Sequence, residues 1–146
     1  MLRIVAANEA EEAAAMSETQ AKRILIVEDD ELCANSLKRL LELEGFGVKT
    51  EPRGAVALNS TAEFQPDLVI LDLKLPDMHG YQVCQALRQR YHAWVMPIVM
   101  FTGLDKPIDQ LRGFAHGADA YLTKPCPSSE LVKTVRLLLG EMALTS

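Results

Sequence analysis

The 146-residue chain lacks two features that would assign it to a common functional class before any motif is considered. Its formal net charge is -5, whereas non-specific nucleic-acid binding needs Lys and Arg side chains that displace counterions from phosphates. No apolar run approaches the roughly 18 residues that span a bilayer, and residues 2–5 are too short for a signal-peptide core. We therefore expect neither direct nucleic-acid binding nor a membrane segment.

Cysteine is also scarce. Cys33, Cys84 and Cys126 are odd in number and far apart, and no C-x-x-C pair is present. This pattern indicates reduced thiols in a cytoplasmic protein rather than a disulfide framework. Hydrophobic residues make up 49% of the chain and charged residues 24%, which is ordinary for one soluble globular domain with a buried core.

The sequence divides into a short extension and one domain. Residues 1–21 are rich in Ala and Glu without a sustained apolar stripe, which predicts a disordered tail or a frayed helix. Residues 22–146 form the expected domain, in which strand-like and helical segments alternate. The expected strands lie at residues 23–27, 48–50, 68–71, 98–101 and 121–123, and the expected helices at residues 31–43, 55–63, 80–90, 107–116 and from 128 onward.

Five successive strand–helix units with short connections predict an α/β fold, in which helices cover both faces of a parallel sheet. The runs at 68–71 and 98–101 are apolar throughout, as expected for strands that are buried on both faces. In the helix at 31–43, apolar residues recur at helical spacing from Cys33 onward, and Asp30 is expected to cap its start.

Several of the expected strands end in a residue that can bind phosphate or a divalent metal. These strand-end residues are Glu28 and Asp29, Asp72, Thr102, and Lys124. In an open parallel α/β sheet, ligands bind in the crevice outside the carboxyl ends of the strands. One edge of the sheet would therefore gather three carboxylates, a hydroxyl and an ammonium group, which predicts a functional site there.

The residue types suit phosphoryl chemistry. A carboxylate such as Asp72 can attack a phosphoryl group and form an acyl phosphate. Glu28 and Asp29 beside it would repel one another by roughly 4 kcal/mol at about 4 Å and an effective dielectric of about 20, and a divalent cation such as Mg²⁺ relieves such crowding. Thr102 can donate to a phosphoryl oxygen, and Lys124 offers a mobile positive charge. Taken singly, Asp72 is often a helix cap or turn residue, Thr102 by default a strand end, and Glu28 and Asp29 part of a solvated acidic turn.

Together, in this order and at matching strand ends, these residues resemble the response-regulator receiver family of two-component and phosphorelay signalling. The resemblance covers about residues 22–142. Its segments are Glu28-Asp29, residues 71–80 (LDLKLPDMHG), Thr102-Gly103 and residues 121–125 (YLTKP). It implies a flavodoxin-like, doubly wound sheet of five parallel strands in the order 2-1-3-4-5, with five helices.

The resemblance also implies a metal site and a phosphoacceptor. Asp72 would accept the phosphoryl group, and Asp29 would be a direct Mg²⁺ ligand. Glu28 would act largely through a metal-bound water, and the backbone carbonyl of Lys74 would complete the protein ligands. Mg²⁺ would be the cofactor, with Mn²⁺ as the alternative ion.

Further implied roles concern the response to phosphorylation. Thr102 and Lys124 would bind the phosphoryl oxygens, with the Lys124–Pro125 peptide bond in the cis form. Tyr121 would be the aromatic residue whose burial accompanies the switch. His79 departs from the common pattern, because the family usually has an acidic residue or Asn there, and we expect a solvated loop residue.

The implied function is that of a phosphoaccepting signalling domain, not a dedicated enzyme. It would take a phosphoryl group from a phosphohistidine on a sensor histidine kinase or histidine phosphotransfer protein, and would assist its own phosphorylation and dephosphorylation. A downstream protein, or a second copy in a homodimer, would dock on the face formed by the helix at 107–116, the strand at 121–123 and the last helix. No further domain follows Met142 in this sequence, so we expect a stand-alone receiver or a piece of a larger regulator or hybrid kinase.

Three competing interpretations are less well supported. A phosphohydrolase with an Asp nucleophile usually has a second acid two residues later, where this chain has Lys74. A flavin-binding module shares the fold, but the turn at residues 28–30 (EDD) lacks the Gly, Ser and Thr that cradle a phosphate. A degenerate receiver used only for protein binding would normally lack one of the key residues, all of which are present.

Overall fold

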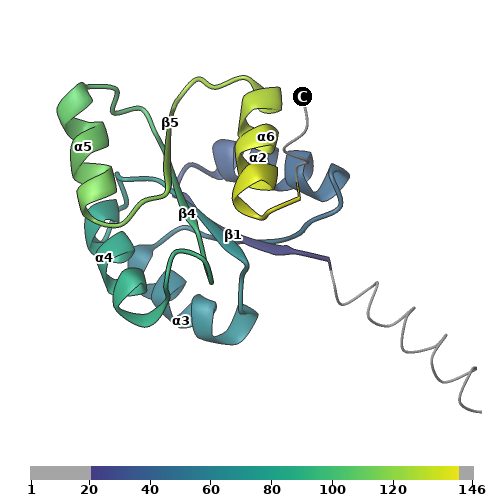
Figure 1. Cartoon of the computed structure of the whole chain (residues 1–146), viewed down its shortest axis with the longest axis horizontal. Coiled ribbons are helices and arrows are strands. Elements are labelled where there is room, and N and C mark those ends of the chain that lie inside the picture. The colour runs from purple at the N-terminus through teal and green to yellow at the C-terminus, as the bar shows by residue number, and fades with distance from the viewer. Residues whose placement is uncertain (1–20, 142–146) are drawn as a thin grey trace, which may run out of the picture.

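In the computed structural model, which describes residues 21–141, the chain forms a parallel sheet between two layers of helices (Figure 1). The strand order β2-β1-β3-β4-β5 confirms the expected fold. The strands are β1 (Arg23–Val27), β2 (Gly47–Glu51), β3 (Leu68–Leu71), β4 (Ile98–Thr102) and β5 (Ala120–Thr123). The helices are α2 (Glu31–Leu43), α3 (Gly54–Phe64), α4 (Gly80–Arg90), α5 (Pro107–Ala115) and α6 (Ser128–Leu138). Residues 1–20 of the expected extension lie outside the described residues.

The sheet is buried on both faces, because successive residues of a strand point to opposite sides. In β1, Leu25 and Val27 belong to the core that packs against α3 and α4, whereas Ile24 and Ile26 belong to the core against α2 and α6. All four side chains are 0% exposed. This two-sided burial explains why the central strands are apolar throughout.

Helix α2 begins and ends where its sequence indicates. The Asp30 carboxylate accepts hydrogen bonds from the backbone N of Leu32 at 3.0 Å and of Cys33 at 3.3 Å, so it is the predicted cap. After Leu43 the chain passes through Gly45 at φ +96°, a conformation that favours glycine. The chain then turns back and enters β2.

Several boundaries differ from the prediction by one residue. β2 runs from Gly47 to Glu51, not from 48 to 50, because it pairs with β1 along its whole length. β4 and β5 are also one residue longer, and Thr102 pairs with Thr123. Helix α3 extends one residue beyond the expected 55–63 at each end, and α5 ends one residue before the expected 116.

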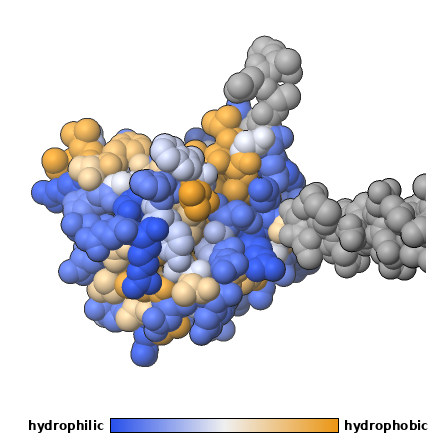
Figure 2. Space-filling model, turned by 60° about the horizontal axis from the view of Figure 1, so that its bottom comes forward, coloured by the Kyte–Doolittle hydropathy of each residue, from blue (hydrophilic) through white to orange (hydrophobic). Residues whose placement is uncertain are grey.

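Much of the visible surface in Figure 2 is hydrophilic, and hydrophobic residues form separate patches on it. Three of the exposed large apolar side chains, Ile108, Leu111 and Phe114, lie on α5. Within residues 21–141, no helix combines the length and hydropathy of a membrane-spanning segment. Helix α5 thus carries a group of exposed apolar side chains.

At the N-terminal edge of the sheet, Arg88 of α4 joins several segments. Its guanidinium donates to the carbonyl oxygens of Gly117 and Met96, each at 2.7 Å, and forms an ion pair with Asp119. Asp119 also accepts from the backbone N of Ile98, at the start of β4, at 2.8 Å. The Arg88 side chain is only 16% exposed, so these bonds are largely shielded from water.

We predict that Arg88→Ala lowers the free energy of unfolding by about 3 kcal/mol, because Asp119 and the carbonyl groups would lose their partner. Arg136→Ala is the matched control. The ion pairs of Arg136 with Glu44 and Glu141 are more exposed, and such pairs contribute at most about 1 kcal/mol. Urea unfolding followed by circular dichroism measures both losses, and equal losses would contradict this role of Arg88.

Candidate functional site

Backbone hydrogen bonds continue past the ends of the strands and fix the residues that follow them. The backbone N of Asp72 donates to the carbonyl oxygen of Val27 at 3.0 Å, which links the ends of β3 and β1. The backbone N of Lys124 donates to the carbonyl oxygen of Thr102 at 2.8 Å, which links β5 to β4. The strand-end side chains therefore meet at one edge of the sheet.

Glu28, Asp29 and Asp72 form a compact acidic cluster at this edge. Each contributes a carboxylate oxygen, and these atoms all lie within 4.8 Å of one another. Glu28 and Asp72 are buried, with 4% and 8% of their surface exposed, whereas Asp29 is exposed. Three carboxylates that are open to water on one side form the hard oxygen-ligand set that Mg²⁺ prefers. The residues present therefore fit this ion.

Lys124 brings positive charge to the acidic cluster. Its Nζ donates to Oδ2 of Asp72 at 3.2 Å and to the carboxylate of Glu28, and it lies 5.4 Å from the centre of the Phe101 ring. Burial acts to lower the pKa of Lys124, but the hydrogen bond to Glu28 and the charge of Asp72 raise the pKa above its usual value. The ammonium group therefore stays charged and bridges two buried carboxylates.

The two buried acids differ in their tendency to ionise. Burial raises the pKa of Glu28; the hydrogen bond from Lys124 opposes this and contact with Asp72 adds to it. Burial also acts to raise the pKa of Asp72, but contacts with Glu28, Lys124 and Thr102 outweigh it and hold the pKa below its usual value. The contacts of Asp72 thus favour its ionised form.

Thr102 and Tyr121 both contact the loop between β4 and α5. Thr102 is 0% exposed, and its hydroxyl accepts from the backbone N of Leu104 at 3.4 Å. Tyr121 is half-buried, and its hydroxyl donates to the carbonyl oxygen of Leu104 at 2.7 Å. A Cβ on Gly113 of α5 would lie 2.9 Å from the Tyr121 ring, so α5 packs closely on this aromatic residue. One loop residue therefore connects the site with the tyrosine.

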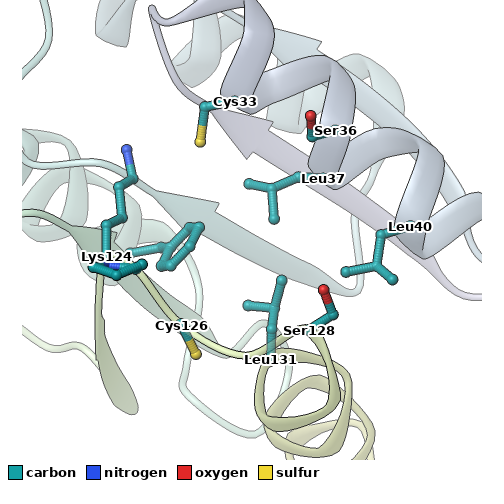
Figure 3. A pocket seen from close by; sticks show the side chains of 10 residues that line it. Cys33, Ser36, Leu37, Leu40, Lys124, Cys126, Ser128 and Leu131 are labelled. Carbon is teal, nitrogen blue, oxygen red and sulfur yellow. The ribbon is translucent and has the colours of Figure 1, made fainter.

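An apolar cavity of about 320 Å³ lies beside the charged site, between α2 and α6 (Figure 3). Leu37 of α2 and Leu131 of α6 line it from opposite helices, with Cys33 and Lys124 at the end nearer the acidic cluster. Burial raises the pKa of Cys33 to about 11, so this thiol stays protonated. The Lys124–Pro125 peptide bond is cis. Apart from Lys124, the residues that line the cavity thus carry no charge.

His79 has a role that sequence reasoning missed. It is exposed, as expected, but it also caps α4, because its Nδ1 accepts from the backbone N of Tyr81 at 3.2 Å. The side chain of Gln82 accepts from the backbone N of His79 at 3.0 Å, which completes a capping box. Gln three residues after the cap was the available sequence signal.

Asp77 is a second residue that sequence reasoning missed. Its carboxylate accepts hydrogen bonds from the backbone N of Gly54 at 2.9 Å and of Ala55 at 3.0 Å, at the start of α3. No short-range pattern could have indicated these bonds, because the partners lie 23 and 22 residues away in sequence.

Comparisons with known proteins agree with this geometry. A family model of the response regulator receiver domain matches residues 24–136. The chain is 42% identical over 122 residues to the DNA-binding response regulator MtrA of Mycolicibacterium smegmatis, covering 84% of this chain and 52% of that protein. It is 41% identical over 117 residues to the phosphate regulon transcriptional regulatory protein PhoB of Rhizobium meliloti, covering 80% and 52%. The chain thus spans about half the length of these relatives.

Solved structures give the same result. The BeF3-activated N-terminal receiver domain of Klebsiella pneumoniae RstA has a TM-score of 0.77 and 34% identity, covering 81% of this chain and 98% of that chain. A CheY-like response regulator receiver domain protein of Methanospirillum hungatei has a TM-score of 0.76 and 33% identity, covering 83% and 95%. The match of sequence, sheet order and extent shows that the chain belongs to the response regulator receiver domain family.

Proposed function

We propose that this chain accepts a phosphoryl group onto Asp72, from a phosphohistidine on a sensor histidine kinase or histidine phosphotransfer protein in the cytoplasm. The observation that carries the proposal is the position of the Asp72 carboxylate, which is buried beside Glu28 and Asp29 and lies 3.2 Å from Nζ of Lys124. Family membership supports a phosphoacceptor role in general. Asp72 is also the one of the three acids that follows the central strand β3 and contacts Lys124 beside Glu28.

In the transfer, a carboxylate oxygen of Asp72 attacks the phosphorus atom. The phosphorus–nitrogen bond of the donor breaks, and its electron pair returns to the imidazole nitrogen. Lys124 lies 3.2 Å from Oδ2 of Asp72, so its ammonium group needs only a small movement to contact a phosphoryl oxygen and offset the developing charge. Thr102 would donate its hydroxyl to another phosphoryl oxygen.

Mg²⁺, or Mn²⁺ in its place, would be held by Asp29, Asp72, the Lys74 carbonyl and, through water, Glu28. The ion would supply positive charge that offsets the repulsion between the carboxylates and the incoming phosphoryl group. Asp29 is the exposed member of this ligand set, so the ion could reach the site from solvent on that side.

Phosphorylation would bias an equilibrium between two conformations through Thr102. The Thr102 hydroxyl would turn toward the phosphoryl group and give up its bond with the backbone N of Leu104. Because the carbonyl of Leu104 accepts the Tyr121 hydroxyl, a movement of this loop would also change the position of the tyrosine. This sequence of contacts would carry the signal from the site to α5.

The partner would read the face formed by α5, β5 and α6. Ile108, Leu111 and Phe114 expose apolar surface on α5 and would contact a downstream protein or a second copy in a homodimer. MtrA is described as a DNA-binding regulator, and this chain spans about half its length. With a net charge of -5, the present chain is proposed to act on proteins and not to contact DNA itself.

Asp72→Asn tests the phosphoacceptor. Acetyl phosphate with Mg²⁺ should add one phosphoryl group to the intact protein, as measured by mass spectrometry, and Asp72→Asn should stay unlabelled because it lacks the nucleophilic oxygen. Asp30→Asn is the matched control, since Asn also caps a helix well, and it should be labelled like the wild type. Full labelling of Asp72→Asn, or of the wild type in excess EDTA, would contradict the proposal.

Asp29→Asn tests the metal ligands. Removing one of the crowded charges should raise the melting temperature of the metal-free protein by about 3 °C, and it should weaken Mg²⁺ binding by about tenfold or more. Mg²⁺ should stabilise the wild type by mass action. Calorimetric titration and thermal melts measure these effects, with Asp30→Asn again as the control. Unchanged Mg²⁺ affinity in Asp29→Asn would remove this residue from the ligand set.

Thr102→Ala and Lys124→Ala should separate switching from metal binding. Thr102→Ala should bind Mg²⁺ like the wild type, because no proposed ligand is lost, but beryllofluoride should no longer shift the amide signals of α5 in NMR spectra. Lys124→Ala should show the same uncoupling even where Asp72 is labelled, because the phosphoryl group would lose its cationic partner. Wild-type amide shifts across α5 in either variant would rule out that residue as part of the switch.

A further inference from the structure

The loop that follows Asp72 is tied to a helix that does not belong to the site. Both carboxylate oxygens of Asp77 accept hydrogen bonds from the start of α3. Oδ1 accepts from the backbone N of Gly54, and Oδ2 accepts from the backbone N of Ala55. The bonds with Ala55 and Gly54 hold the pKa of Asp77 below its usual value. An ionised carboxylate at this position suits the positive end of a helix dipole.

Helix α3 supplies no side-chain cap of its own. Arg53 has the extended backbone of a capping residue, with φ -130° and ψ 145°, but its side chain makes no capping hydrogen bond. The residues that cap well are Ser, Thr, Asp and Asn, so Arg is a poor choice for this position. The first N–H groups of α3 are satisfied instead by Asp77, a residue of the loop after the phosphoacceptor.

Packing beside Asp77 leaves the loop little freedom. A Cβ on Gly54 would lie 2.5 Å from Cγ of Met78 and 2.8 Å from Cγ2 of Val83. The first residue of α3 therefore fits against Met78 only because it has no side chain. The hydrogen bonds that Asp77 accepts and the close packing of Met78 act on the same short contact between loop and helix.

The other end of the loop closes next to the site. The backbone N of Gly80 donates to the carbonyl oxygen of Leu73 at 2.8 Å, and Lys74 and His79 form an antiparallel bridge. A Cβ on Gly80 would lie 2.4 Å from the carbonyl oxygen of Asp72, so the closure is tight. Lys74 therefore lies in a small closed loop whose far side is held by Asp77.

We propose that Asp77 is a positioning residue for the metal site. By holding the loop against α3, it fixes the backbone of Lys74, and with it the carbonyl group that would complete the Mg²⁺ ligands. This inference rests on the proposed function, in which the Lys74 carbonyl binds Mg²⁺. Asp77 itself contacts α3 and acts on the ion only through the loop.

Asp77→Ala is the first test, with the whole chain and Mg²⁺ alone as the probe. We expect the Mg²⁺ dissociation constant, measured by calorimetric titration, to rise by about fivefold to tenfold because the loop loses its anchor. Labelling of Asp72 by acetyl phosphate should slow at limiting Mg²⁺ and return toward the wild-type rate at saturating Mg²⁺. An unchanged dissociation constant would overturn the proposal.

A second variant separates positioning from simple loss of a helix cap. Arg53→Ser would give α3 a local cap, since Ser accepts from the N–H groups of the first turn without any contact to the loop. The double variant Arg53→Ser/Asp77→Ala should therefore regain much of the melting temperature lost in Asp77→Ala but keep its weak Mg²⁺ affinity. Arg53→Ser alone is the matched control and should bind Mg²⁺ like the wild type.

The outcomes distinguish this inference from the function on which it rests. Recovery of Mg²⁺ affinity together with the melting temperature in the double variant would make Asp77 a helix cap only. In that case the wild type would still bind Mg²⁺ and accept a phosphoryl group. A wild type that binds no Mg²⁺ would overturn the proposed metal site and the role of Asp77 together.

Discussion

The ammonium group of Lys124, shared between the buried carboxylates of Glu28 and Asp72, is the interaction on which the site depends. Two carboxylates about 4 Å apart repel by roughly 4 kcal/mol at an effective dielectric of about 20, and burial adds a desolvation cost. The positive charge of Lys124 offsets both the repulsion and the desolvation cost, and it sits at the end of a flexible aliphatic side chain. In the proposed phosphorylated state, its charge would follow the phosphoryl group on Asp72 without leaving the site, so the same cation would serve both states.

The parallel sheet makes this interaction available at low entropic cost. Glu28 and Lys124 are separated by 96 residues in sequence, and Asp72 and Lys124 by 52. Each follows a strand whose backbone bonds are satisfied by its neighbours, and all the strands point the same way. The order β2-β1-β3-β4-β5 places β1 beside β3, which brings the two buried acids together. Packing of the two apolar cores thus stabilises the fold and also positions charges that repel one another.

The spacing of apolar residues, together with the capping and turn residues between the segments, was enough to predict the sheet, its helices and the strand-end residues. Apolar runs such as 68–71 identified strands buried on both faces, and Asp30 identified the start of α2. The missed features are contacts between side chains and distant backbone. Asp77 caps α3 across more than twenty residues, and nothing near Arg53 indicates which distant residue supplies the cap. The predicted ends of β2 were each wrong by one residue for a similar reason. The pairing of this strand with β1 sets its ends, and its own sequence does not show that pairing.

Two loops leave the site, and they differ in how they are held. The loop after Asp72 is closed on itself near Gly80 and held to α3 by Asp77, so it is suited to keeping ligand geometry constant. The loop after Thr102 is attached through Leu104 to one threonine and one tyrosine, and its bond with Thr102 is long, at 3.4 Å. A weak bond of this kind is easily exchanged for a stronger one to a charged phosphoryl oxygen. The contacts on the two sides of Asp72 thus differ: hydrogen bonds and close packing hold the loop toward α3, and one long hydrogen bond joins Thr102 to the loop toward α5. Under the proposed function, the first loop would keep the metal ligands in place and the second would change its contacts when Asp72 is phosphorylated.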